Sequence, residues 1–465
     1  MSSSIPKRKM IINDPIFRIM HFHGSDSEKK ILKAVIDSKE FQRLRRISQL
    51  GLASHVFPGA THSRFCHSLG TAYVASQILD HLQIICGDVK EIEEQRFEVI
   101  LAALLHDIGH GPFSHSFEHV LSDFSKEKKA NFKVMHEEWT LGIITSKESE
   151  VNNILRKNKV KISRLATPFS GKGDMELFLK QIVSSQLDAD RMDYLVRDAH
   201  FSGVSLGSID TSYLINCLTI IEHANNSKSL GLTSKGIRTY ESFAFSRQLM
   251  NRSVYFHPKV KVAEYMVERL IRILIEKSPS LCKHSVYPKY FTVLYDALFN
   301  STRLPEEALF INKNINHYLN LTDDSVYVLI NFLMGKKVSK EILNLCDRII
   351  HRRLYEHYRI VEGKASILEN QLVSYGYKKG VDFEIKELKS SIYKEKDGER
   401  VFVRRADSVI ESIGSQSQLI SAFTDKSEGE QLLIILNEDQ GEIENIKIIA
   451  EEINNCLMLP RDEVA

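Results

Sequence analysis

The chain has 465 residues, 43% of them hydrophobic, and can bury a large core in one extended domain or two closely joined ones. Its 62 lysines and arginines nearly balance 60 aspartates and glutamates, which excludes an overall field that would attract nucleic acid or anionic lipid. The scattered cysteines form no CxxC pair, and no apolar run approaches the roughly 20 residues of a membrane span. We therefore expect a cytoplasmic protein without a signal peptide or a membrane segment.

The first third of the chain is predicted to be mainly helical. Residues 11–15 indicate a short extended segment that ends in a turn. Apolar residues at helical spacing over residues 31–50 predict two helices, with Asp37 and Ser38 as a break and cap between them. A loop is expected at residues 51–60. Further helices are expected at about residues 63–87, 91–106, 115–122 and 136–145.

The middle of the chain combines helices with one hairpin. A polar, lysine-rich stretch at residues 146–173 has no clear periodicity. Residues 218–222 and 229–232 flank Asn225 and Asn226, which predicts a β-hairpin. Helices are expected at about residues 175–185, 188–198, 237–255 and 259–276.

The pattern changes after about residue 278. Asp397 and Gly398, between the alternating residues of 392–403, form the strongest short hairpin motif in the chain. Residues 281–465 lack a dense cluster of His, Asp or Glu, so we expect a smaller α+β lobe that acts as a scaffold or an oligomerisation surface. Elements are expected there at about residues 287–299, 325–334, 340–354 and 442–456 (helices) and 382–388 and 432–436 (strands).

An adjacent His-Asp pair follows the apolar run of residues 99–105. Adjacent residues on a helix point about 100° apart, so His106 and Asp107 converge only on something that lies beside both. Imidazole and carboxylate are both good ligands for divalent first-row metals, so a metal ion suits this pair. Two glycines and a proline then break the helix and place His110 and His115 on the turn that follows.

More ligands than one pair are needed to hold a metal, and two further segments offer them. His67 lies upstream in the sequence HSRFCHSLG, and Asp190 lies downstream in DADRMDY. The order His, His-Asp, Asp resembles the ligand pattern of the HD phosphohydrolase superfamily. That resemblance implies that His67, His106, Asp107 and Asp190 bind a divalent metal ion. Such a ligand set accepts Mn, Fe, Zn or Co, and Mg is possible at a second position.

Several other segments resemble one branch of that superfamily. They are the sequences QRLR from Gln42, QLG from Gln49, VFPGA from Val56 and HDIGHGPFSH from His106. They are similar to the deoxynucleoside triphosphate triphosphohydrolases, in the branch whose vertebrate member carries a sterile-alpha-motif domain, which is not expected before the motif here. The resemblance implies a mainly α fold with an HD-domain helical core, small β-hairpins and the C-terminal α+β lobe. Residues 1–280 would form the phosphohydrolase core with an N-terminal regulatory segment.

The resemblance also implies the roles of four catalytic residues. The related enzymes use the histidine that matches His115 to protonate the departing 5′ oxygen. His110 and Glu118 match the residues that hold and tune that histidine, and Glu118 stands where the family usually has an aspartate. His136 matches a further active-site histidine, although alone it would also fit a polar residue at a helix start.

The substrate implied by the resemblance is a deoxynucleoside triphosphate. Gln49 and Asp198 match residues that bind the 3′ hydroxyl, and Leu50 and Tyr255 would crowd the 2′ position. Taken alone, Leu50 and Tyr255 would be assigned to the core. The groups that match phosphate-binding residues are Arg64, Arg191, Tyr194 and Arg247, of which Arg191 replaces the family's lysine.

Four N-terminal residues match a regulatory nucleotide site in the related enzymes. They are Asn13, Asp37, Gln42 and Arg45, and the activator would be GTP or a dNTP. Met10 stands where that site has a lysine, and Asp37 could equally cap a helix. The resemblance implies a homo-oligomer, either a dimer or a tetramer.

Two other functions compete with a dNTP triphosphohydrolase. The first is a different HD phosphohydrolase, such as a nucleotidase or a phosphodiesterase. The second is a nucleotide-sensing or nucleic-acid-binding module on an HD scaffold, against which the complete ligand set and His115 argue. The sequence leaves the base preference and the identity of the metal open.

Overall fold

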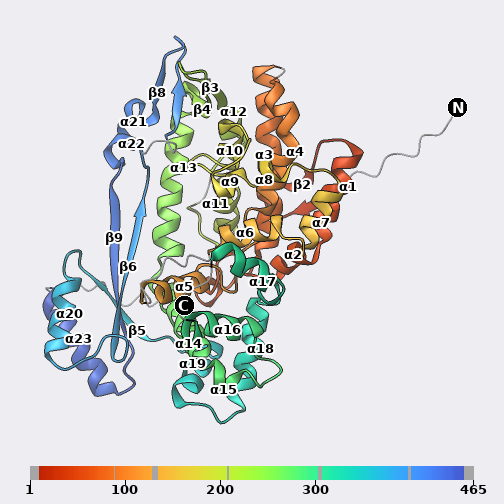
Figure 1. Ribbon diagram of the computed structural model, residues 1–465. Coiled ribbons are helices and arrows are strands. Elements are labelled where there is room, and N and C mark those ends of the chain that lie inside the picture. Colours follow the sequence, from red (N-terminus) through yellow and green to blue (C-terminus); the bar gives the residue numbers. More distant parts are fainter. Residues whose placement is uncertain are drawn as a thin grey trace.

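The computed structural model describes residues 10–87, 89–127, 135–206, 209–301, 306–395 and 400–454. Helices dominate these residues and three small sheets accompany them, so the prediction of a mainly α protein is confirmed (Figure 1). No helix among the described residues combines the length and apolar character that crossing a bilayer requires.

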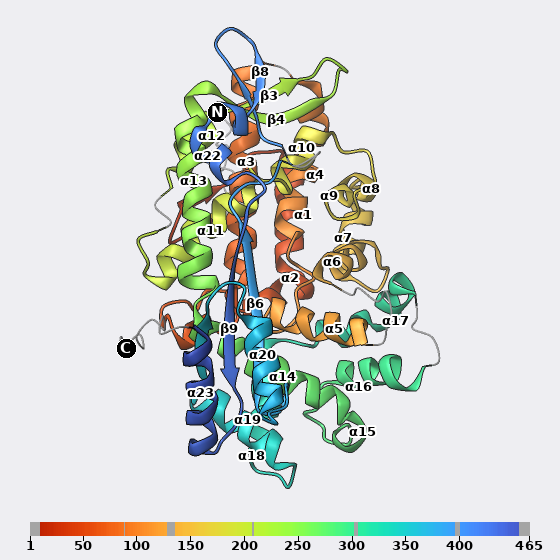
Figure 2. The same cartoon turned by 90° about the vertical axis from the view of Figure 1, so that its left-hand side faces the viewer.

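The centre of the molecule is built on two long adjacent helices, α3 (Arg64–Cys86) and α4 (Lys90–Leu105) (Figures 1 and 2). Helix α3 is buried around most of its circumference, since α11 (Ala189–Ser202) and strand β3 also pack on it. A helix that is covered on all sides lacks a single apolar stripe, as expected for the middle of a large core. The bounds of both central helices agree with the sequence prediction within a few residues.

The N-terminal segment folds against this centre. Strands β1 (Ile11–Asp14) and β2 (Arg18–His21) form an antiparallel pair, and α1 (Asp26–Asp37) is followed by α2 (Lys39–Arg43). Ser38 ends α1 and accepts a hydrogen bond from the backbone of Phe41 through Oγ, which confirms the predicted break and cap. Regular helix ends at the short turn η1 (Leu44–Arg46), earlier than residue 50, because the chain then doubles back to pair with the start of α3.

The predicted hairpin is confirmed as β3 (Leu218–Glu222) and β4 (Lys228–Thr233). It belongs to a sheet of order β3-β4-β7-β8, in which β7 (Phe402–Arg404) runs parallel to β4, and β8 comprises Ile410–Ser412. Asp397 and Gly398 lie outside the described residues, so the second predicted hairpin motif is not seen. Its flanks pair elsewhere, since Tyr393 bridges to Thr424 and β7 pairs with β4 and β8.

Helix α13 (Ile237–Met250) continues into a π-helical turn, η4 (Asn251–Tyr255), and α14 (Pro258–Glu276) follows. The polar stretch at residues 146–173 contains three short helices. The remaining helices and helical turns are η2 (Ala53–His55), α5 (His115–Glu127), α6 (His136–Thr145), α7 (Glu150–Lys157), α8 (Ile162–Leu165), α9 (Thr167–Ser170), α10 (Leu177–Val183), α12 (Thr211–Asn216) and η3 (Ser234–Gly236).

The main hydrophobic core continues beyond residue 280. Phe291, Leu329 and Leu345, from the helices that follow α14, are buried in the same core as the residues of α3 and α4. The boundary predicted between residues 280 and 281 lies within α15 and stays a prediction. The helices and turns of this region are α15 (Ser278–Leu281), α16 (Lys289–Tyr295), η5 (Asp296–Asn300), α17 (Glu307–Leu319), α18 (Asp323–Met334) and α19 (Lys340–Ile350).

A smaller lobe at the C-terminal end has a core of its own. Its sheet has the order β5-β9-β6, all antiparallel, and α20 and α23 pack against it (Figure 1). Along β9, Leu432 and Ile434 are buried in the main core, whereas Leu433 and Ile435 are buried in the small one. Side chains alternate between the two faces of a strand, so β9 joins both cores. The elements here are β5 (Glu356–Ile360), α20 (Ala365–Ser374), β6 (Phe383–Ser391), β9 (Ser427–Ile435) and α23 (Gln440–Asn454). The short helices α21 (Ile413–Gln416) and α22 (Gln418–Phe423) belong instead to the main core, in which Ile413 and Ile420 are buried.

Candidate metal centre and active site

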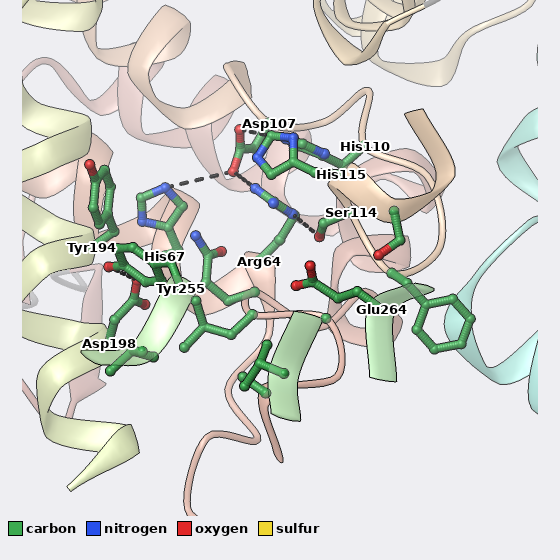
Figure 3. A pocket seen from close by; sticks show the side chains of 18 of the residues that line it. Arg64, His67, Asp107, His110, Ser114, His115, Tyr194, Asp198, Tyr255 and Glu264 are labelled. Atoms are coloured by element: carbon green, nitrogen blue, oxygen red, sulfur yellow. Dashed lines mark hydrogen bonds and ion pairs between the residues drawn. The ribbon is translucent and has the colours of Figure 1, made fainter. Parts of the chain in front are cut away.

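A pocket of about 470 Å³ opens where α3, α11, α14, the turn before α5 and the η4 turn meet (Figure 3). Side chains from segments far apart in the sequence face one another across it. Among those predicted as site residues, the lining includes Gln49, Leu50, Arg64, His67, Asp107, His110, His115, His136, Asp190, Tyr194, Asp198, Arg247 and Tyr255.

The four predicted metal ligands lie together at one end of the pocket. His67 Nε2 lies 3.2 Å from His106 Nε2, 3.0 Å from Asp190 Oδ1 and 3.6 Å from Asp107 Oδ2. His106 Nε2 lies 3.3 Å from Asp107 Oδ1 and 3.4 Å from Asp190 Oδ1. His67 is held by α3, the His-Asp pair follows the end of α4, and Asp190 lies in the first turn of α11.

The hydrogen bonds around these ligands fit a cation between them. His67 Nδ1 lies 2.7 Å from Asp193 Oδ2 and His106 Nδ1 lies 2.8 Å from the carbonyl oxygen of Ala103. Carboxylate and carbonyl oxygens only accept, so both Nδ1 atoms carry the hydrogen, and each ring in its neutral form would offer a lone pair on Nε2. Two lone pairs and two carboxylates that converge need a positive charge between them, and a divalent metal ion supplies it.

The electrostatics of the cluster agree with that conclusion. Burial lowers the pKa of His67, but the carboxylates of Asp190 and Asp193 outweigh burial and raise the pKa to about 10. Burial also raises the pKa of the Asp190 carboxyl, whereas its hydrogen bonds to His106 and His67 lower it well below the usual range overall. Positive charge is therefore favoured between these side chains.

A buried network holds His67 in place. Asp193 accepts a hydrogen bond from Arg197 Nε at 2.9 Å, and Arg197 Nη1 donates to Asp14 at 2.7 Å. Gly70 makes room for this network, because a Cβ at that position would lie 1.8 Å from Asp193 Oδ1. The N-terminal strand β1 thus supports the metal ligands through Asp14 and Arg197.

Four side chains beside the metal ligands form a second cluster, which consists of His110, His115, Glu118 and His136. Glu118 lies at its centre, with Oε2 at 2.9 Å from His115 Nδ1 and Oε1 at 2.6 Å from His136 Nδ1. The rings of His110 and His136 stack at 3.8 Å between centroids. The glutamate at this position therefore reaches His115, which it is predicted to hold, and also His136.

The members of this second cluster differ in charge and in exposure. Burial lowers the pKa of His110 well below its usual value, and Arg64 and His136 lower it further, so this ring is neutral. Burial lowers the pKa of His136, but Glu118 outweighs it and raises the pKa overall. His115 is the most open of the four, with 62% of its side chain exposed. Since Glu118 occupies its Nδ1 and no hydrogen bond to Nε2 is formed within the described residues, His115 can offer Nε2 to the pocket.

A further part of the pocket lining, which we call the sugar wall, contains Gln49, Asp198 and Tyr255. Their polar groups can form hydrogen bonds with hydroxyl groups. Tyr255 donates a hydrogen bond to Asp198 Oδ2 at 2.6 Å (Figure 3). His62 Nε2 lies 2.9 Å from Asp198 Oδ1. Asp198 is thus held from both sides at the edge of the pocket. Gln49 also lines the pocket, and its buried Oε1 has no hydrogen-bond partner among the described residues.

Three of the four predicted phosphate-binding residues line the pocket, namely Arg64, Tyr194 and Arg247. Arg64 pairs with Asp107 and donates to Ser114 Oγ at 2.8 Å through Nε. Arg191 is absent from the lining, since it turns toward Asp188 and the carbonyl oxygen of Ser185. The sequence position of Arg191 beside a metal ligand did not determine the direction of its side chain.

Comparison with known proteins identifies the chain's relatives. The HD domain family matches residues 64–198, and the family described as HD associated region matches residues 209–289. The uncharacterized protein YwfO of Bacillus subtilis is 30% identical over 373 residues, which is 80% of this chain and 77% of YwfO. The chain belongs to the HD-domain family.

Other relatives of this HD protein have names that state an activity. The human deoxynucleoside triphosphate triphosphohydrolase SAMHD1 is 29% identical over 284 residues, which is 55% of this chain and 43% of that protein. The HD protein therefore spans less than half of the human relative. A crystal structure of a phosphohydrolase from Bacteroides thetaiotaomicron matches with a TM-score of 0.70 at 26% identity, covering 92% of this chain and all of that one.

The four predicted regulatory residues of the HD protein lie in the N-terminal segment, from β1 to η1, and their role stays a prediction. Asn13 lies in β1, and Asp37 pairs with Lys33 on α1. Gln42 Nε2 donates to the carbonyl oxygen of Ile36 at 2.8 Å, and Arg45 Nε donates to Gln42 Oε1 at 2.8 Å. Of the four, Gln42 lines a separate cavity of about 850 Å³.

Sequence reasoning missed several residues that shape the site. Asp193 lies three positions after Asp190 on a helix, and that spacing could have indicated a supporting carboxylate. His62, which holds Asp198, has no such local pattern. Lys261 and Glu264 line the pocket as an ion pair of 2.7 Å, but this spacing is also typical of solvated helix faces. Their position became clear only from the packing of α14.

Proposed function

We propose that this HD protein hydrolyses deoxynucleoside triphosphates to a deoxynucleoside and inorganic triphosphate. One observation carries the proposal: a single pocket is lined by metal ligands, by a histidine with a free Nε2 and by a tethered carboxylate suited to a sugar hydroxyl. The SAMHD1 relatives, whose names state this activity, support it. Phosphohydrolase activity follows directly from membership of the HD-domain family. The deoxynucleoside triphosphate substrate is inferred in addition from the pocket and from the SAMHD1 relatives.

The residues that would hold the metal are His67, His106, Asp107 and Asp190. A bound divalent metal supplies an activated water and polarises the phosphate oxygens. The Nδ1–H groups of the two histidines donate to Asp193 and Ala103, which keeps both Nε2 atoms facing the centre. Arg64, which pairs with Asp107 here, can offer its other N–H groups to a phosphate oxygen.

His115 would supply the proton for the leaving 5′ oxygen. Its Nδ1 is held by Glu118, so the imidazolium form would present the proton on Nε2 toward the pocket. The carboxylate of Glu118 accepts from Nδ1–H and so fixes the orientation of the ring. Burial raises the pKa of Glu118, but hydrogen bonds from His115 and His136 outweigh it and keep the pKa well below the usual range.

The remaining wall would select the sugar and neutralise the phosphates. Asp198 would accept the 3′ hydroxyl, and Tyr255 and Leu50 would occupy the space that a 2′ hydroxyl needs. Excluding a hydroxyl with an apolar wall gives a discrimination of only about 10²-fold in general. Arg247 and Tyr194 would contact the phosphates, because both line the pocket near the metal ligands.

We also propose that a nucleotide, either GTP or a dNTP, activates a homo-oligomer through Asn13, Asp37, Gln42 and Arg45. Three of these side chains are engaged within one subunit, by Lys33, by Ile36 and by one another. An activator would therefore have to displace these contacts or bind beside them. The comparison of rates with and without GTP and dATP tests this regulatory role.

A second candidate is a nucleotidase or phosphodiesterase that uses the same metal centre. The likeness to the phosphohydrolase from Bacteroides thetaiotaomicron, over 92% of this chain, supports this candidate and the triphosphohydrolase equally. The two candidates predict different products from a nucleoside triphosphate. A nucleotidase releases orthophosphate and a phosphodiesterase releases a nucleoside monophosphate, whereas a triphosphohydrolase releases tripolyphosphate.

Product analysis by mass spectrometry tests the proposal. The protein is incubated with each dNTP and each NTP under Mn, Mg, Fe or Co, with and without GTP and dATP. The expected products are a deoxynucleoside and tripolyphosphate, with little turnover of NTPs. Orthophosphate, pyrophosphate or a nucleoside monophosphate as the first product would overturn the triphosphohydrolase assignment, and turnover of no nucleotide would overturn the enzyme assignment.

A further inference from the structure

The corner between α17 and α18 contacts the active-site loops directly, although it lies more than 200 residues further along the chain. Asp323, the first residue of α18, is 4% exposed. Its Oδ1 accepts a hydrogen bond from the backbone N–H of Phe113 at 2.7 Å, and its Oδ2 accepts one from Ser48 at 2.9 Å. One carboxylate therefore joins two separate loops.

Each of those loops carries predicted site residues. Ser48 directly precedes Gln49 and Leu50, and Phe113 lies two residues before His115. A second bond ties the loops together, since Ser114 Oγ donates to the carbonyl oxygen of Ser48 at 2.9 Å. The distance between the sugar wall and the proton-donating histidine thus depends on how these two loops are held.

The turn that Asp323 holds has an unfavourable backbone. Phe113 has a φ of 54° and Ser114 a φ of 56°, so two consecutive residues with side chains are in the left-handed region. Such a conformation persists where surrounding contacts determine it. The Phe113 ring packs edge-on against Tyr327 of α18 at 5.5 Å, so the same helix holds both the backbone and the side chain.

The placement of Asp323 is not explained by the needs of its own helix. Thr322 caps α18 and forms a reciprocal pair with Ser325, so the helix start is satisfied without Asp323. Burial raises the pKa of the Asp323 carboxyl, although its hydrogen bonds to Phe113 and Ser48 and the positive charge of Arg43 lower it. A buried carboxylate is costly unless hydrogen bonds compensate, and the largest compensation here comes from the N–H groups of the two loops.

The corner itself is fixed to the rest of the core. Arg43 donates through Nε and Nη2 to the carbonyl oxygen of Leu321 at 3.1 and 2.9 Å. Tyr318 donates to the carbonyl oxygen of Gly109 in the catalytic turn, and its ring stacks on Trp139 at 3.7 Å. The corner is therefore a rigid support rather than a mobile loop end.

We propose that Asp323 is a positioning residue, which sets the loop of Gln49 and Leu50 against the turn that carries His115. It acts through the backbone of Ser48 and Phe113 and touches no substrate. The identity of the substrate rests on the proposed function, but the positioning role does not. Asp323 lies beyond residue 280, so in this proposal the C-terminal region helps to position the site, in addition to any scaffold role.

The test compares Asp323→Ala and Asp323→Asn with Asp324→Ala. Asp324 is the next residue on the same helix turn, its side chain is 64% exposed, and its nearest cation, Arg46, lies at 3.8 Å. Asp324→Ala removes the same charge from the same helix end without touching either loop.

We expect Asp323→Ala to lower kcat/KM by about 10²-fold, the scale on which small misplacements act, with kcat affected through His115 and KM through Gln49. Asn retains one acceptor, so Asp323→Asn should recover part of the loss.

A second measurement separates positioning from loss of fold. Hydrogen exchange of peptides that cover residues 47–51 and 109–116 should accelerate in Asp323→Ala and stay unchanged in Asp324→Ala, while the metal content and the exchange of α3 remain as in the wild type. Unchanged exchange at both loops, or activity per folded molecule equal to that of Asp324→Ala, would overturn the inference. If the wild type turns over no nucleotide, the proposed function fails while the exchange experiment still decides the role of Asp323.

Discussion

The metal-binding core and the small C-terminal lobe bury different kinds of side chain. The lobe's core consists of apolar residues such as Leu368, Phe383 and Leu433, and Asn454 is a buried polar residue that satisfies the backbone at 359 and 361. The core around α3 and α11 instead buries many ionisable groups, including Asp14, Arg64, His67, Asp193 and Arg197. Buried charges destabilise a fold unless they are paired or ligated. Their concentration in one region indicates where the chemistry occurs.

Strand β9 makes the comparison sharper, because it belongs to both regions. Leu432 and Ile434 face the main core, and Leu433 and Ile435 face the small one. Substitution of Leu433 or Ile435, on the face toward the small core, should therefore affect only packing. Substitutions in the buried ionisable network of the main core should instead affect the metal centre. The predictions below run from the largest expected effect to the smallest.

Removal of the central ligand pair should abolish metal binding and activity. We expect His106→Ala with Asp107→Ala to lose bound metal and all activity, because the other two ligands cannot hold the ion alone. The fold should persist, since apolar packing supplies most of its stability. Elemental analysis and circular dichroism check both points, and retained metal would contradict the ligand assignment.

Loss of the proton donor should be smaller and leave the metal in place. His115→Ala should lower turnover by about 10²–10⁴-fold, the usual range for a general acid, with metal content and substrate affinity retained. His317→Ala, an exposed histidine of α17, is the matched control. Steady-state kinetics of both variants decide the point, and an unchanged kcat for His115→Ala would rule out its role.

The buried support of His67 should matter for stability as well as for the metal. Arg197→Met removes the guanidinium that pairs with the buried carboxylates of Asp14 and Asp193, which should cost about 3–5 kcal/mol in the free energy of unfolding. Urea denaturation measures this loss. Metal affinity, followed by titration into the metal-free protein, should fall at the same time because Asp193 no longer has a fixed orientation. Full affinity would show that Arg197 supports only the fold.

The sugar wall offers a test with a matched pair of variants. Tyr255→Phe removes the hydroxyl that donates to Asp198 and keeps the ring, whereas Tyr255→Ala removes both. We expect Tyr255→Ala to reduce the preference for dNTPs over NTPs by up to about 10²-fold, and Tyr255→Phe to change it less. Competition assays with both substrates measure the ratio. An equal effect of the two variants would show that the ring does not exclude the 2′ hydroxyl.

A substitution in the core of the small lobe should lower local stability and leave the metal centre unaffected. Leu433→Ala opens a cavity in its apolar core and should cost about 2–5 kcal/mol in local stability. Because the described residues that form this core are apolar and none of them is a predicted site residue, kcat and metal content at 25 °C should stay as in the wild type. Hydrogen exchange of α20 and α23 reports the local loss. A matching loss of metal would show that the two regions are coupled more tightly than their packing indicates.

Local patterns in the sequence determined much of this protein. The periodicity of apolar residues located α3, α4 and α6 within a residue or two, and the Asn225-Asn226 motif located the β3–β4 hairpin. These predictions succeed because helix and hairpin formation depend on residues close in the chain. The His-Asp pair, together with the family resemblance, also indicated four ligands that the structure places within 3.6 Å of a neighbour in the set.

Only the tertiary structure decided the rest. It turned Arg191 toward Asp188 and away from the pocket, and it paired β7 with β4 across some 170 residues of chain. It also placed Asp323 beneath the catalytic turn and Lys261 with Glu264 on the pocket wall. Each outcome depends on which of several partners a side chain or strand meets after packing. Local propensity carries no information about that choice, because the partners are distant in sequence and compete only in the folded state.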